Sequence, residues 1–135
     1  MCLSIKLFSR KQIAEQDIEV FKVLRASPGL LGWKTPYRQI PVSFAVPMKA
    51  RLSRGIMSVN AGIHSYTTRD GANKAKAYMG DADFMWGWFE PDTFRIFKAV
   101  IPKGAEYYEG FHEYTEHRWT GSYASNQLII LNQYA

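Results

Sequence analysis

Cysteine is almost absent from this sequence, because Cys2 is the single one among 135 residues. One cysteine cannot form an internal disulfide, which excludes a small secreted protein held together by disulfides. No apolar run reaches the roughly 18 residues that a membrane helix needs, and residues 1–8 lack the apolar core of a signal peptide. We therefore expect a soluble, cytoplasmic protein without a membrane partner, in which Cys2 packs as a small hydrophobic residue.

Motifs for catalysis, metal binding or phosphate binding are also missing. His112 and His117 are five residues apart, whereas a helical metal site needs two histidines four apart, and Gly110 and Gly121 favour a loop around them. His64 is expected to be a structural histidine at the end of a strand. The sequence thus predicts no catalytic residue, no metal and no cofactor, which favours a protein that is not an enzyme.

Apolar and aromatic residues are plentiful: they make up 47% and 15% of the chain. A chain of this length and composition can bury one core without disulfides or metals, and disordered chains lack such aromatic content. The sequence therefore predicts a single domain over residues 1–135.

Runs of β-branched and aromatic residues predict strands near 19–25, 56–66, 93–101 and 127–131. Three prolines between residues 30 and 47 forbid a helix there, so an ordered, extended segment is expected.

One helix is predicted over residues 70–79. Thr67 and Thr68 offer capping hydroxyls before it, and Gly80 follows as a stop signal. The apolar stripe of this helix would consist of Ala72, Ala75 and Met79. The expected fold class is α+β: a single compact domain with a mostly antiparallel central sheet, one principal helix and long ordered loops.

An aromatic segment within residues 81–92 is predicted to be a loop. It contains Trp86, Trp88 and Phe89. In an extended loop Trp86 and Trp88 point to one side and Phe89 to the other. The loop either covers the core or presents tryptophans to a protein partner, for which Trp is well suited.

The charge distribution is uneven within a net charge of +5. Residues 34–54 contain no acidic residue, and their basic residues are Lys34, Arg38, Lys49, Arg51 and Arg54. A locally acidic stretch follows later, with Glu106, Glu109, Glu113 and Glu116. The basic segment is either a solvated surface or a patch for nucleic acid, a ribonucleoprotein or an acidic protein, and the two segments are complementary to each other.

Short motifs over residues 62–131 resemble those of small proteins from bacteria and their phages: Gly-Ile-His-Ser-Tyr at 62–66, Ile-Pro-Lys-Gly-Ala at 101–105 and Tyr-Ala-Ser at 123–125. Their order also resembles, more loosely, the ADP-ribosyltransferase fold. That resemblance implies an NAD cleft formed by Arg25, His64, Ser65 and Tyr66, while residues 125–127 lack the glutamate that catalysis in that family requires.

Two functions are therefore expected from the sequence. The first is a small non-catalytic binding protein, of phage or mobile-element origin, that binds a host or defence protein. The alternative is a divergent or inactive ADP-ribosyltransferase-like domain that binds NAD.

Overall fold

The computed structural model describes residues 3–4, 10–26, 32–35, 40–86, 94–115 and 118–135. Within them, strands pair into one 12-stranded sheet in which every pairing is antiparallel. The long strands are β3 (Ile18–Ala26), β9 (Phe94–Ile101), β10 (Glu106–Thr115), β11 (Arg118–Ser125) and β12 (Gln127–Tyr134). The short ones are β1 (Leu3–Ser4), β2 (Gln12–Ile13), β4 (Trp33–Lys34), β5 (Pro47–Lys49), β6 (Ser53–Arg54), β7 (Ser58–Ala61) and β8 (Ile63–Tyr66).

The order of strands across the sheet is β5-β12-β9-β3-β8-β11-β10-β1-β7-β6, with β2 beside β10 and β4 beside β3. The predicted mostly antiparallel sheet is confirmed, although the sheet dominates the fold more than the α+β class suggested.

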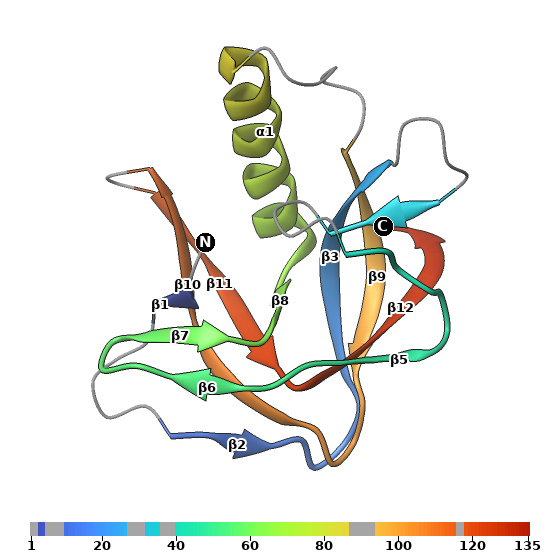
Figure 1. Cartoon of the computed structure of the whole chain (residues 1–135), viewed down its shortest axis with the longest axis vertical. Helices are drawn as coiled ribbons and strands as arrows, with labels where there is room; N and C mark the ends of the chain where they lie inside the picture. Colours follow the sequence, from blue (N-terminus) through green and yellow to red (C-terminus); the bar gives the residue numbers. More distant parts are fainter. Residues whose placement is uncertain (1–2, 5–9, 27–31, 36–39, 87–93, 116–117) are drawn as a thin grey trace.

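One helix, α1 (Arg69–Trp86), accompanies the sheet within the described residues. Figure 1 shows it rising from the end of β8, between the β10–β11 hairpin and the pair β3 and β9. Its predicted start is confirmed, since the Gly71 N–H donates to the Thr68 hydroxyl at 3.0 Å, as an N-cap requires. Ala72 and Ala75 are fully buried against the sheet, as the apolar stripe predicted.

The predicted end of the helix was wrong, because α1 continues through Gly80 to Trp86. A single glycine inside a helix costs about 1 kcal/mol relative to alanine, which neighbouring helical turns can offset. The first proline after Gly80 is Pro91, so nothing in residues 81–86 forbids the helix.

The sequence also missed β10 and β11, which occupy the segment predicted to be a loop around His112 and His117. The two strands pair from Tyr107↔Ser125 onward, and Gly121 lies opposite Phe111. A Cβ at Gly121 would lie 2.7 Å from the Thr67 hydroxyl oxygen. This glycine therefore marks a close approach of two segments rather than a loop.

The core lies on both faces of the sheet. The larger cluster is on one face and contains Val20, Leu24, Ile63, Phe97, Ala99, Ile101, Leu128 and Ile130. The smaller cluster lies under α1 and contains Val23, Tyr66, Ala72, Ala75, Phe94 and Ile96. Residues alternate between the two along β3, so this strand is buried on both faces.

The strand predicted over 56–66 is divided into β7 and β8 by Gly62, whose φ is +153°. An added Cβ there would lie 2.8 Å from Leu52 Cδ1 and 3.4 Å from Ala124 Cβ. The backbone of a non-glycine residue rarely adopts this φ.

Gly62→Ala is therefore expected to lower the free energy of unfolding by about 1–3 kcal/mol, measured by urea denaturation. Gly32→Ala is the matched control, since a Cβ there meets nothing within 4 Å, and we expect a change within about 0.5 kcal/mol. Equal effects of the two substitutions would contradict this account of Gly62.

Candidate functional site

The sheet has a seam between β3 and β8. Strand β3 pairs with β9 along eight registered positions, from Ile18↔Ile101 to Arg25↔Phe94. In the described residues it meets β8 at one registered pair, Phe21↔Tyr66. The seam therefore separates a half-sheet of β5, β12, β9 and β3 from a half-sheet that begins with β8 and β11.

The four residues of the expected cleft lie on the two strands of this seam but not on one face. The Arg25 guanidinium carbon is 5.5 Å from the centre of the Phe94 ring, and both Phe94 and Tyr66 belong to the cluster under α1. His64 shares the face of Tyr66, because side chains alternate along β8. Ser65 points to the other face, where its cross-strand partner is Tyr123. Arg25 and Ser65 therefore do not line one cleft, in contrast to the transferase-like arrangement that the sequence suggested.

Lys22 is the charged residue that the sequence analysis overlooked at the seam. Its side chain is only 7% exposed, and its ammonium donates a hydrogen bond of 2.6 Å to the backbone carbonyl of His64. Burial lowers the pKa of Lys22 from 10.5 to about 8. Lys22 lies between Val20 and Leu24 on one face of β3, so the alternation of the strand could have indicated its burial.

Lys22 links the two half-sheets, because the carbonyl that it binds belongs to β8. Ser65 is fully buried next to that carbonyl, and its hydroxyl has no hydrogen-bond partner among the residues that the structure describes. A nucleophile must reach its substrate, and neither side chain is accessible enough to do so. At the seam, the Lys22 hydrogen bond therefore joins the two half-sheets.

The basic segment does not form one uniformly exposed row. Lys34 is half-buried opposite Arg25, Arg54 is half-buried, and Arg38 lies outside the described residues. Lys49 and Arg51 are exposed, and within the described part of the chain neither makes an ion pair or a side-chain hydrogen bond. Two of the five predicted cations are thus available to a partner.

A hairpin between β6 and β7 presents two large apolar side chains a few residues further along the chain from these cations. Ile56 and Met57 are 76% and 62% exposed. The Gly55 N–H donates to the Ser58 carbonyl at 2.7 Å and closes the turn. We call residues 49–57, with the exposed side chains of Lys49, Arg51, Ile56 and Met57, the docking strip.

Arg54 holds the tip of the docking strip in place. Its guanidinium donates to the carbonyls of Gly55 at 3.0 Å and Ile56 at 2.7 Å, and lies 5.8 Å from the centre of the Tyr108 ring. Tyr108 is buried with Val59 in the core. The exposed pair Ile56 and Met57 is therefore fixed to the sheet. Sequence reasoning placed this pair at the start of a strand and so missed it.

The predicted aromatic surface falls largely outside the described residues, which exclude Trp88 and Phe89. Trp86 is the last residue of α1, so the extended alternation expected of it was wrong. Cys2 and His117 also lie outside the described residues, and His112 is on β10.

The described part of the chain contains no cluster of three or more histidines, cysteines or acidic residues that could hold a metal ion. Within that part, no helix has both the length and the apolar character that crossing a membrane requires, and α1 is rich in polar residues.

No family model, no curated protein and no solved structure matches this chain. The resemblances stated from the short motifs therefore stay expectations.

Proposed function

We propose that this chain is a small non-catalytic binding protein that docks on a partner protein through the docking strip. The observation that carries the proposal is the pair Ile56 and Met57, two exposed apolar side chains on a turn that Arg54 and the Gly55–Ser58 hydrogen bond hold in place. A rigid anchor loses little conformational entropy on binding, so more of its buried apolar area contributes to affinity.

The positive charge of this part of the chain favours a partner whose surface combines acidic groups with an apolar pocket. Residues 20–69 contain eight Lys and Arg and no Asp or Glu. Of these, Lys49 and Arg51 are exposed in the chain segment that leads to the apolar tip, and they lack ion-pair partners within the described residues. A partner that combines an apolar pocket with acidic groups facing Lys49 and Arg51 would satisfy both cations and gain association rate from them. The class of partner that we propose, a host or defence protein, follows the expectation from the sequence that the short motifs resemble those of phage proteins.

Site-specific photocrosslinking tests the proposal. With p-benzoylphenylalanine in place of Met57, we expect one discrete protein adduct in cells, because the side chain would lie inside the interface. The matched control is the same group in place of Ile13, which is 63% exposed on β2 and is not part of the docking strip. The adduct at position 57 should disappear in the Lys49→Glu/Arg51→Glu background, and equal yields from both positions would contradict the proposal.

A nucleic-acid titration tests the competing interpretation, in which the basic segment binds nucleic acid instead of a protein. If Lys49 and Arg51 alone met phosphates, the logarithm of the binding constant would fall with the logarithm of salt with a slope of about −2. We expect a slope no steeper than about −2, which means weak binding with few phosphate contacts. A slope steeper than about −4 would mean many phosphate contacts, and would assign this surface to nucleic acid instead of protein.

A further inference from the structure

Two tyrosines and a glutamate converge on one face of the β10–β11 hairpin. The Tyr107 and Tyr123 rings meet edge to face, with centres 5.4 Å apart. Glu109 lies directly opposite Tyr123 in the register and two residues from Tyr107, so all three side chains share this face. Both tyrosines are half-buried and Glu109 is exposed, so a molecule in solution can reach them. We call these three residues the tyrosine–glutamate triad.

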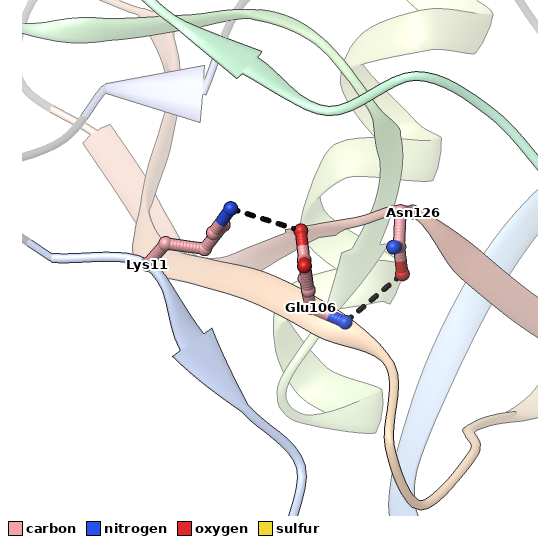
Figure 2. Close-up of polar contacts among 3 residues, drawn as sticks. All are labelled: Lys11, Glu106 and Asn126. Atoms are coloured by element: carbon pink, nitrogen blue, oxygen red, sulfur yellow. Dashed lines mark hydrogen bonds and ion pairs between the residues drawn. The ribbon is translucent and has the colours of Figure 1, made fainter.

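The triad is held rigidly. The Tyr107 hydroxyl donates to Gln12 Oε1 at 3.0 Å, and both rings pack against the larger core cluster. Figure 2 shows how the start of β10 is fixed: Lys11 pairs with the Glu106 carboxylate at 3.1 Å, and the Glu106 N–H donates to Asn126 Oδ1 at 2.9 Å. Tyr107 follows Glu106 directly, so these contacts also set its position.

The tyrosine–glutamate triad carries a negative charge on Glu109. Glu106 is neutralised by Lys11, whereas Glu109 has no ion pair or side-chain hydrogen bond within the described residues. Burial, then Glu109, then Glu15 raise the pKa of Tyr107. Burial, then Glu109, then Tyr107 raise the pKa of Tyr123. The Glu109 carboxylate therefore acts on both rings, and an added cation would be attracted by the carboxylate and by the ring faces together.

We propose that the tyrosine–glutamate triad is a binding site for an arginine side chain presented by another protein. A guanidinium is planar, so it can stack on one tyrosine while its N–H groups donate to the Glu109 carboxylate. A lysine ammonium can pair with the carboxylate but cannot stack, which favours arginine. This site is separate from the docking strip and does not depend on the function proposed for that strip.

The probe is the short peptide acetyl-Gly-Arg-Gly-amide, followed by NMR of the ring signals of isotope-labelled tyrosines. We expect saturable shifts of Tyr107 and Tyr123, and about fivefold weaker binding of the matched lysine peptide. The citrulline peptide, which has nearly the same shape without the charge, should not bind. Equal binding of the arginine and citrulline peptides would overturn the proposal.

Glu109→Gln is the decisive variant because the residue is exposed and the substitution keeps the shape of the side chain. It should weaken binding of the arginine peptide by about fivefold or more, whereas Glu19→Gln, the same charge change at an exposed position of β3, should leave it unchanged. If both variants weaken binding equally, the effect comes from the net charge of the protein and not from Glu109, and the proposed site is wrong. If sedimentation shows self-association that Glu109→Gln abolishes, the arginine comes from a second copy of this chain, which supports the site as well.

Discussion

Raising the pH from 7.5 to 10 is expected to stabilise the native protein by about 2 kcal/mol through Lys22 alone. Burial lowers the pKa of Lys22 to about 8 in the folded state, whereas it is 10.5 in the unfolded chain. Between these two values the unfolded chain binds more protons than the folded one. The free energy of unfolding therefore rises with pH, and the full cost of the buried charge, about 3 kcal/mol, applies only below pH 8.

Lys22→Met should abolish this rise, because methionine fills similar space without a titrating group. At pH 7.5 the gain from removing the buried charge is partly offset, since the His64 carbonyl loses its hydrogen bond, a loss of about 1–3 kcal/mol. Urea denaturation at both pH values measures the difference. The range ends at pH 10 because Tyr107 and Tyr123, whose pKa values are raised, oppose the effect above it.

Lys98→Met is the control, since Lys98 is half-buried on the adjacent strand β9 and the substitution leaves Lys22 in place. It should keep the pH dependence of the wild type. If the wild type and Lys22→Met depend on pH to the same degree, Lys22 is not a charged group inside the sheet, and the account of the seam is wrong.

Phe97→Ala is expected to lower the free energy of unfolding by about 3–5 kcal/mol, the largest loss from a single substitution that we anticipate. Phe97 is among the largest fully buried side chains. Its ring contacts Trp33, Phe44 and Tyr134 at centre-to-centre distances of 4.9, 5.3 and 5.1 Å. The segments that bear these rings come from three separate parts of the chain, so removing the central ring should loosen all of them.

Phe97→Leu keeps most of the buried volume and should cost less than half as much. Denaturation curves of the two variants give the comparison, and near-ultraviolet circular dichroism reports the packing of Trp33. A cost for Phe97→Ala of 1 kcal/mol or less would show that the aromatic cluster is not part of the core that holds this face of the sheet.

The sequence predicted those elements whose local signals agree with their surroundings. Strands β3, β9 and β12 are β-branched and alternate, and the start of α1 carries a capping threonine, so each was found near its observed bounds. The hairpin of β10 and β11 was missed because its glutamates and glycines are typical of loops. Its stability comes from cross-strand pairing, which depends on residues distant in the sequence.

The candidate sites were harder to predict for the same reason. The burial of Lys22 depends on the face of β3 that it occupies, and the tyrosine–glutamate triad depends on the register between β10 and β11. The exposure of Ile56 and Met57 depends on a turn closed by Gly55 and Ser58, although the sequence favoured a continuous strand there.

The affinity of the crosslinked partner for an Ile56→Ser/Met57→Ser variant tests the central claim most directly. Isothermal titration calorimetry should show Kd raised by about 30-fold or more relative to the wild type, as expected when a buried interface anchor of about 2 kcal/mol is removed. The variant should keep its melting temperature, because both side chains are exposed in the free protein. Ile13→Ser, at another exposed apolar position, should bind as the wild type does. An unchanged Kd for the double variant would contradict the proposal that this protein acts through the docking strip.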